Sequence, residues 1–243
     1  MAPEFNAAAW LVDRHVEAGR GERIAVRGSR TLTYAELSEL SGDVAASLRR
    51  LGLRRDDRVV FVMSDDVELL GGVLGAFRAG VVAVPISTML GAHELAKILA
   101  DSGARVVCAT HEYVEAVAAA IDLAPEVGHL VLTGADGLPA LSTASARSWD
   151  DFIALGSEGT EQDRVVASTD EDAWALWLYT SGTTGSPNGA MHRHANSRPL
   201  CHCFRDRGPV DRAEDVSWSV AQPLLSSAHG APACSPPPPG PAP

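Results

Sequence analysis

The segment that decides the fold is Val59–Pro85, which reads VVFVMSDDVELLGGVLGAFRAGVVAVP. Five consecutive apolar residues, Val59–Met63, predict a strand that is buried on both faces. A helix is expected over 66–79, ended by Gly80 and followed at once by a second strand over 81–84. A strand, a helix and a strand in this order predict a β-α-β unit with parallel strands.

The same segment contains an apolar run that invites another interpretation. Leu69–Leu90 carries a single charge, Arg78, and is about long enough to cross a bilayer. Four glycines and Pro85 interrupt the run, however, and they divide it into a helix and a strand. The pattern therefore favours a buried helix followed by a strand over a membrane span.

Alternation of helix and strand continues on both sides of this unit. Thr33 and Glu36 match a capping box at the start of one of the predicted helices. The expected elements are a helix over 5–16, a hairpin of strands 24–26 and 31–33, helices over 34–51, 92–101 and 112–121, and strands over 105–109, 129–133 and 173–179. Strands separated by helices predict an α/β fold, with a mostly parallel sheet flanked by helices.

Composition limits the classes of function. The chain has 243 residues, 46% of them hydrophobic, which is enough to form a sizeable core. Its 20 Lys and Arg against 31 Asp and Glu give a net charge of −11, so binding to nucleic acid or to an anionic membrane surface is not expected. Four unevenly spaced cysteines and an N-terminus without a secretory signal predict a reduced, cytoplasmic protein.

A loop rich in glycine and hydroxyl side chains follows the strand over 173–179. Thr180–Gly189 contains three glycines, Gly182, Gly185 and Gly189, among Ser and Thr residues. Glycine lets backbone N–H groups approach a phosphate oxygen closely, and hydroxyls add donors without charge. The loop therefore predicts a phosphate-binding site, although it lacks the Gly-Lys-Ser/Thr of a Walker A loop.

Tyr179–Gly189 resembles the phosphate-loop signature of the adenylate-forming (AMP-binding) acyl-CoA synthetase superfamily. The family pattern, Thr-Ser-Gly-Thr-Thr-Gly-x-Pro-Lys-Gly, is matched except at the lysine, where this chain has Asn188. The flanking segments Leu11–Val16, Pro85–Leu90 and Ala190–Asn196 are similar to the benzoate–CoA ligase branch. The resemblance extends from residue 5 to about residue 230.

This resemblance implies an ATP-dependent acid–CoA ligase. In that family a carboxylate attacks the α-phosphate of Mg-ATP to give acyl-AMP and pyrophosphate, and coenzyme A then displaces AMP. The resemblance implies a carboxylic acid substrate (an aromatic acid), ATP with Mg²⁺ and coenzyme A as partners, with no nucleic acid and no membrane. The residues that it assigns to ATP phosphate binding are Thr180, Ser181, Gly182, Thr183, Thr184, Gly185, Asn188 and Gly189.

Departures from the family pattern lower the activity expected of this chain. Asn188 removes a charge-assisted contact worth about 1.5–3 kcal/mol. Family members continue well beyond the length of this chain, with the parts that carry the catalytic and Mg²⁺-binding residues. We therefore expect an N-terminal fragment with an incomplete fold, no catalytic or metal-binding residue of its own and no ligase activity. Residues 1–230 would form a partial adenylation domain, and the proline-rich tail 231–243 would be disordered.

Two alternatives from other classes remain open. The chain could be a relic or pseudoenzyme that binds phosphate weakly or not at all. It could also be a metal-binding module, because five potential ligands lie close together, although their spacing matches no standard zinc finger. These ligands are His192, His194, Cys201, His202 and Cys203. The acidic segment 134–172 is interpreted as a solvated loop with a short helix that begins at Ser148.

Overall fold

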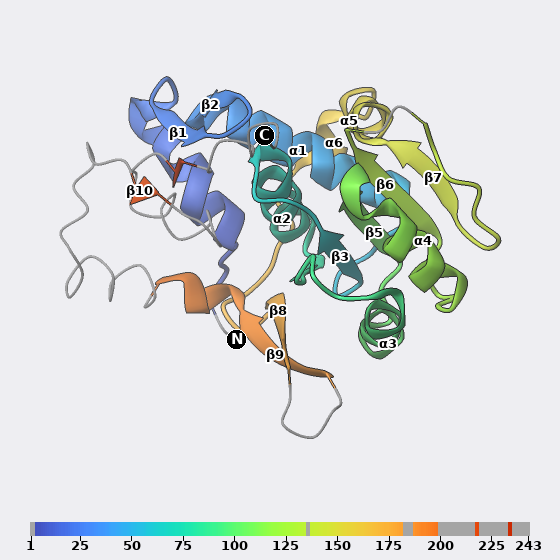
Figure 1. The fold of residues 1–243 in the computed structure, drawn as a ribbon. Coiled ribbons are helices and arrows are strands. Elements are labelled where there is room, and N and C mark those ends of the chain that lie inside the picture. The colour runs from blue at the N-terminus through green and yellow to red at the C-terminus, as the bar shows by residue number, and fades with distance from the viewer. Residues whose placement is uncertain (1–2, 135–136, 182–186, 199–216, 219–232, 235–243) are drawn as a thin grey trace.

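The computed structural model describes residues 3–134, 137–181, 187–198, 217–218 and 233–234. Its main sheet has the strand order β7-β6-β5-β3-β4-β8-β9 (Figure 1). Neighbouring strands run parallel from β7 to β8, and β9 pairs antiparallel with β8. The strands are β3 (Arg58–Val62), β4 (Val82–Pro85), β5 (Val106–Thr110), β6 (His129–Thr133), β7 (Ser145–Ser148), β8 (Trp174–Ser181) and β9 (Pro187–Arg193). The predicted α/β fold with a mostly parallel sheet is confirmed.

Helices cover both faces of this sheet. Alternate residues of β3 take part in two different core clusters: Val59 and Phe61 join the first, and Val60 and Val62 join the second. Helices α1 (Tyr34–Arg50), α2 (Val67–Ala79) and α5 (Trp149–Ser157) supply the first cluster, and α3 (Ala92–Ser102) and α4 (Val114–Asp122) supply the second. The predicted burial of β3 on both faces is therefore correct.

The predicted β-α-β unit is present, with α2 packed closely on α1. A Cβ added to Gly75 would lie 2.3 Å from Val44 Cγ1, so glycine is what lets the two helices approach. Gly80 ends α2 with φ of 74°, which favours glycine over other residues. None of the helices in the described part of the chain combines the length and hydrophobicity that a bilayer crossing requires.

The predicted capping box of α1 is confirmed, whereas the opening helix is less regular than expected. Thr33 N–H donates to Glu36 Oε2 (2.7 Å), and Glu36 N–H donates to Thr33 Oγ1 (3.2 Å). The opening segment forms two π-helical stretches, Ala9–Asp13 and Val16–Arg20, and Gly19 lies inside the second with φ of 72°. A small sheet of order β10-β11-β1-β2 contains β1 (Ile24–Arg27), β2 (Thr31–Thr33), β10 (Ser217–Trp218) and β11 (Ala233–Cys234).

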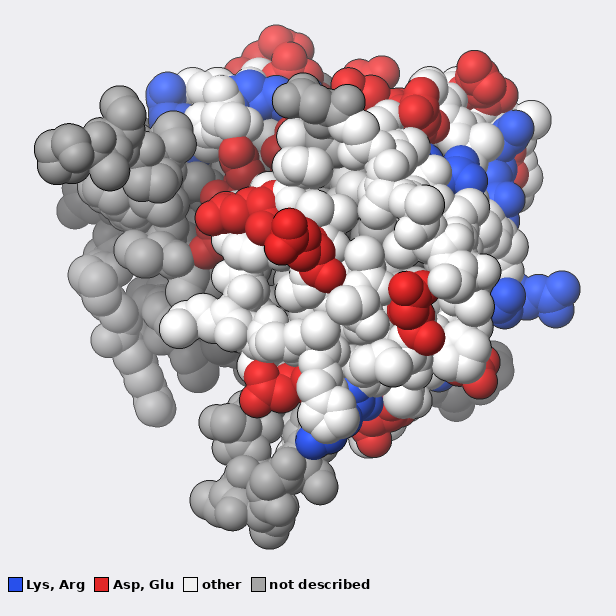
Figure 2. Space-filling model, turned by 45° about the vertical axis from the view of Figure 1, so that its right-hand side comes forward, with Lys and Arg blue, Asp and Glu red and all other residues white. Residues whose placement is uncertain are grey.

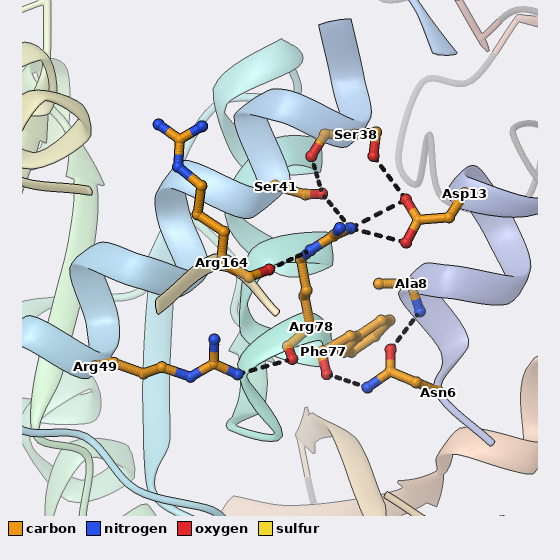
Figure 3. A network of polar contacts seen from close by, with 9 residues as sticks. All are labelled: Asn6, Ala8, Asp13, Ser38, Ser41, Arg49, Phe77, Arg78 and Arg164. Atoms are coloured by element: carbon orange, nitrogen blue, oxygen red, sulfur yellow. Dashed lines mark hydrogen bonds and ion pairs between the residues drawn. The ribbon is translucent and has the colours of Figure 1, made fainter. Parts of the chain in front are cut away.

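A partly buried ion pair connects the opening segment to α2 (Figure 3). Arg78 Nη1 donates to both carboxylate oxygens of Asp13, at 3.0 and 2.9 Å, and Ser38 Oγ donates to the same carboxylate (2.7 Å). Arg78 Nε also donates to the carbonyl of Arg164 (3.0 Å), in the segment that leads toward β8. The ion pair thus connects the opening segment, α1, α2 and the segment at Arg164, and the Arg78 side chain is 14% exposed.

The interpretation of residues 134–172 as mostly loop is wrong in part. Ser148 does cap a helix, α5, by accepting from Asp151 N–H (3.1 Å), as predicted. The segment also contains β7 and a single helical turn, α6 (Glu161–Arg164), which the sequence did not predict. Both are polar and lack an apolar repeat, and β7 pairs along one side only, with β6.

Candidate functional site

The hairpin of β8 and β9 brings together part of the predicted phosphate loop. Tyr179 pairs with Gly189, Thr180 with Asn188 and Ser181 with Pro187. Four of the predicted site residues, Thr180, Ser181, Asn188 and Gly189, therefore lie on paired strand ends, whereas Gly182, Thr183, Thr184 and Gly185 lie outside the described residues. The sequence predicted β8 but not β9, because Pro187 and Gly189 are poor strand formers.

The ring of Tyr179 explains why position 189, on the opposite strand of the hairpin, is a glycine. A Cβ at position 189 would lie 3.2 Å from Tyr179 Cζ, closer than an ordinary contact. Gly189 lets the aromatic ring lie over the backbone of the opposite strand. This is a packing requirement, and it adds to the phosphate-binding role that the family resemblance implies for Gly189.

The hydroxyl of Tyr179 reaches α3. It donates to Asp101 Oδ2 at 2.6 Å, across 78 positions of sequence. Burial raises the pKa of Tyr179, and the hydrogen bond to Asp101 raises it further, so the phenol stays protonated and able to donate. Sequence reasoning missed this contact, since Asp101 belongs to no recognisable motif.

Trp177 makes a second contact toward the end of α3. The guanidinium carbon of Arg58 lies 5.7 Å from the centroid of the Trp177 ring. Arg58 in turn donates to the carbonyls of Ser102 and Gly103, which follow Asp101. The face of β8 that carries Trp177 and Tyr179 is thus connected to the last turn of α3.

His194 holds the base of the hairpin. Its side chain is fully buried, and its Nδ1 accepts from the backbone N–H of Ala7 (3.1 Å). Its ring meets Phe77 edge-on, with 5.7 Å between centroids. Burial, with a smaller contribution from Arg55, lowers the pKa of His194 to about 4, so the imidazole is neutral at pH 7.

The histidine and cysteine group considered as a metal site is only partly described. His194 Nδ1 already accepts from Ala7, and His192 Nδ1 lies 3.4 Å from the amide nitrogen of Asn196. Cys201, His202 and Cys203 lie outside the described residues. Within the residues that the structure describes, no three His, Cys, Asp or Glu side chains are grouped closely enough to bind a metal ion.

The carboxyl ends of the parallel strands, where ligands of such sheets usually bind, are tied together by side chains. After β3, the N–H of Ser64 donates to Thr110 Oγ1 at the end of β5 (3.0 Å). The hydroxyls of Ser64 and Tyr113 also lie 3.2 Å apart. These contacts hold the carboxyl ends of the strands in place. They do not pair a nucleophile with a base.

One part of the surface is acidic and disfavours the binding of an anion. Acidic side chains gather along the upper edge of the molecule in Figure 2, at the height of β2 and α5 in Figure 1. A cavity of about 690 Å³ between β2, α1, α2 and α5 is lined by Glu36, Glu39, Asp43, Glu68 and Asp150, with Arg30 as the only cation in its lining. This cavity would repel a nucleotide phosphate.

Comparisons with known proteins agree on the family to which this chain is similar. Residues 12–229 match the family described as AMP-binding enzyme. A 4-hydroxybenzoate–CoA/benzoate–CoA ligase of Rhodopseudomonas palustris is 34% identical over 220 residues, which are 90% of this chain and 39% of that protein. A benzoate–CoA ligase of Thauera aromatica is also 34% identical over 220 residues, which are 90% of this chain and 40% of that protein.

The solved structures agree on the fold. The crystal structure of a benzoate CoA ligase from Burkholderia xenovorans superposes with a TM-score of 0.78 at 28% identity, over 95% of this chain and 45% of that one. The chain thus spans about two fifths of the length of the curated relatives that it matches.

Proposed function

The chain belongs to the family of AMP-binding enzymes, and on this premise we propose that it is the phosphate-binding portion of an ATP-dependent acid–CoA ligase. The observation that carries the proposal is the β8–β9 hairpin, in which Thr180 and Ser181 are paired with Asn188 and Pro187. This pairing brings both ends of the family's phosphate-loop signature to one end of the hairpin.

The proposed substrates are an aromatic carboxylic acid, ATP with Mg²⁺, and coenzyme A. Two benzoate–CoA ligases among the relatives support the aromatic acid. In the proposed reaction, a carboxylate oxygen attacks the α-phosphate of ATP, pyrophosphate leaves with the bridging oxygen, and the sulfur of coenzyme A then displaces AMP from the acyl carbon. Mg²⁺ would enter as part of the Mg-ATP complex.

The role proposed for this chain is to hold the phosphates that leave as pyrophosphate. Backbone N–H groups and the hydroxyls of Thr180, Ser181, Thr183 and Thr184 would donate to phosphate oxygens as negative charge builds on the leaving group. These donors carry no net charge, which suits a site on a protein of net charge −11 because the binding is short-range and geometrically selective.

We propose further that the 243-residue chain alone does not complete the reaction. It matches 39% of the length of its Rhodopseudomonas relative. Purified chain incubated with benzoate, ATP and coenzyme A is expected to form no thioester above the enzyme-free blank. Thioester formation above that blank would contradict this part of the proposal.

Binding of ATP to the purified chain, followed by isothermal titration calorimetry, tests the phosphate-binding role. We expect a dissociation constant below about 1 mM, which corresponds to roughly 4 kcal/mol. The variant Asn188→Lys restores the family's positive charge and is expected to bind ATP about tenfold more tightly or better, as a charge-assisted contact would.

A matched control adds the same charge just after the hairpin. Asn196 is exposed and lies beyond the end of β9, so Asn196→Lys raises the net charge equally without reaching the loop. This variant is expected to change ATP affinity less than twofold or so, because exposed charges at a distance are screened by salt. Absence of binding heat in the parent chain and in Asn188→Lys would favour the relic alternative.

A further inference from the structure

We propose that Tyr179 is a positioning residue for the phosphate loop, acting through the hydrogen bond from its hydroxyl to Asp101. The bond would fix the outer half of the β8–β9 hairpin against α3 and thereby set the place of Thr180, Ser181, Asn188 and Gly189. The inference concerns the position of the hairpin. Only its consequence, that ATP binding depends on this position, rests on the proposed function.

The pairing of the strands shows why the hairpin needs an anchor. In the described part of the chain, β4 and β8 share one register pair, Ala83 with Leu176. Beyond Leu176, β8 continues for five residues whose recorded strand pairs are with β9. The two strands project from the rest of the sheet in Figure 1, with α3 to one side. In the described residues, pairing with β4 therefore holds the base of the hairpin but does not extend to its outer half, where Trp177 and Tyr179 contact the apolar cluster that includes α3.

Tyr179 is well placed to anchor both strands at once. Its ring lies over Gly189 of β9, while its hydroxyl donates to Asp101 of α3 at 2.6 Å. Trp177 lies two residues earlier on β8, on the same face of the strand, and faces Arg58 at 5.7 Å. Tyr179 thus forms a direct hydrogen bond to α3, whereas Trp177 is connected to the end of α3 through Arg58.

Asp101 is an acceptor that α3 does not require for its own stability. It lies in the last turn of the helix, where the negative charge of a carboxylate is unfavourable because it is close to the negative end of the helix dipole. It is also exposed, so its removal or replacement leaves no buried group without a partner. Loss of the bond should therefore free the hairpin without unfolding the body of the protein.

Hydrogen exchange of individual backbone amides tests the position of the hairpin directly. Tyr179→Phe keeps the ring over Gly189 and removes only the donor, and Asp101→Ala removes only the acceptor. In both variants we expect the amides of residues 178–180 and 188–190 to exchange about tenfold faster, as the loss of a bond to a charged acceptor implies. The amides of β3 and β5, and the midpoint of global unfolding, are expected to stay unchanged.

Two further variants separate the bond from general effects of substitution. Asp101→Asn keeps an acceptor oxygen and is expected to retain protection close to that of the parent chain. Tyr113→Phe removes a phenol that contacts Ser64, after β3, and is expected to leave the hairpin amides unchanged. Unchanged exchange in both Tyr179→Phe and Asp101→Ala, or an equal increase throughout the sheet, would overturn the positioning role.

Calorimetric titration with ATP separates this inference from the proposed function. If the hairpin loosens and ATP affinity falls severalfold in Tyr179→Phe and Asp101→Ala but not in Tyr113→Phe, both are supported. If the hairpin loosens but the parent chain binds no ATP, the anchor stands and the proposed function fails. If the hairpin loosens and ATP affinity is unchanged, the proposed function stands and the positioning of the phosphate loop by Tyr179 is wrong.

Discussion

The sheet body and the β8–β9 hairpin differ in what holds them in place. In the body, the central strand β3 has apolar side chains on both faces, with Val59, Val60, Phe61 and Val62 at most 1% exposed. The hairpin has a half-buried Tyr179 and an exposed Met191. Three aromatic side chains of β8, Trp174, Trp177 and Tyr179, pack against one of the two apolar clusters, and single polar contacts connect the hairpin to α3 and to the opening segment. Apolar contacts on both faces define the body, whereas the place of the hairpin depends on apolar packing together with a few directional contacts.

Because the two regions are held differently, substitutions in the hairpin can change the binding loop while the sheet body keeps its fold. A change in the body alters total stability, because the core is one cooperative unit. A change in a hairpin contact alters local opening first. Four substitutions, from the largest expected effect to the smallest, test whether the two regions are separable in this way.

Phe61→Ala should have the largest effect. Phe61 is 1% exposed in the middle of the sheet, and the loss of its ring leaves a cavity in the core. We expect the free energy of unfolding in urea to fall by about 3–5 kcal/mol. A loss below about 1 kcal/mol would mean that the body is not a tightly packed unit, and the contrast with the hairpin would fail.

Arg78→Met should come next. The substitution leaves the carboxylate of Asp13, 15% exposed, without its cationic partner, and we expect a loss of about 3–4 kcal/mol in the same measurement. The double variant Asp13→Leu with Arg78→Met removes both charges and is expected to recover most of the loss. If the single and double variants are equally unstable, packing of the long Arg78 side chain matters more than the ion pair.

His194 predicts a dependence of stability on pH. The pKa of His194 is lowered from 6.5 to about 4 in the folded chain, so below pH 6.5 the unfolded chain binds a proton that the folded chain does not. The contribution of neutral His194 to the free energy of unfolding is complete above pH 6.5. It is lost as the pH falls from 6.5 toward 4, and the total loss is about 3 kcal/mol.

Comparison with His194→Gln isolates this contribution. Glutamine keeps an acceptor for the Ala7 N–H but does not titrate, so the variant should lose less stability than the parent chain between pH 6.5 and 4. The other titrating groups are common to both proteins, so their contributions cancel in the difference. Parallel pH profiles would show that folding does not lower the pKa of His194.

Arg193→Ala should have the smallest effect. Arg193 pairs with Asp172 at the base of the hairpin, but the two side chains are 50% and 64% exposed. Exposed ion pairs contribute little, so we expect a change below about 0.5 kcal/mol in the free energy of unfolding and no change in hairpin exchange. An increase in hairpin exchange like that expected for Tyr179→Phe would show that any polar contact can anchor the hairpin.

Sequence reasoning succeeded where the signal is local. Consecutive apolar residues mark β3, the Thr33–Glu36 spacing marks the start of α1, and Gly80 marks the end of α2. It failed for β7 and β9, whose polar or glycine-containing sequences form strands only because a neighbouring strand offers hydrogen bonds.

The candidate site was predictable only as a motif. The Gly- and hydroxyl-rich loop identified the family and half of the hairpin, because phosphate binding requires those residue types in sequence. The contacts that position the hairpin join Tyr179 to Asp101 and His194 to Ala7, pairs separated by 78 and 187 positions. Such pairs are determined by the tertiary fold, and no local sequence pattern predicts them.

Protection of backbone amides by ATP tests the central claim, that the hairpin holds nucleotide phosphate, most directly. Exchange would be measured on the parent chain with and without several millimolar Mg-ATP, residue by residue. We expect slower exchange in residues 178–190 and no change around the acidic cavity between α1 and α5. Unchanged exchange in the hairpin, or protection confined to that cavity, would contradict the claim.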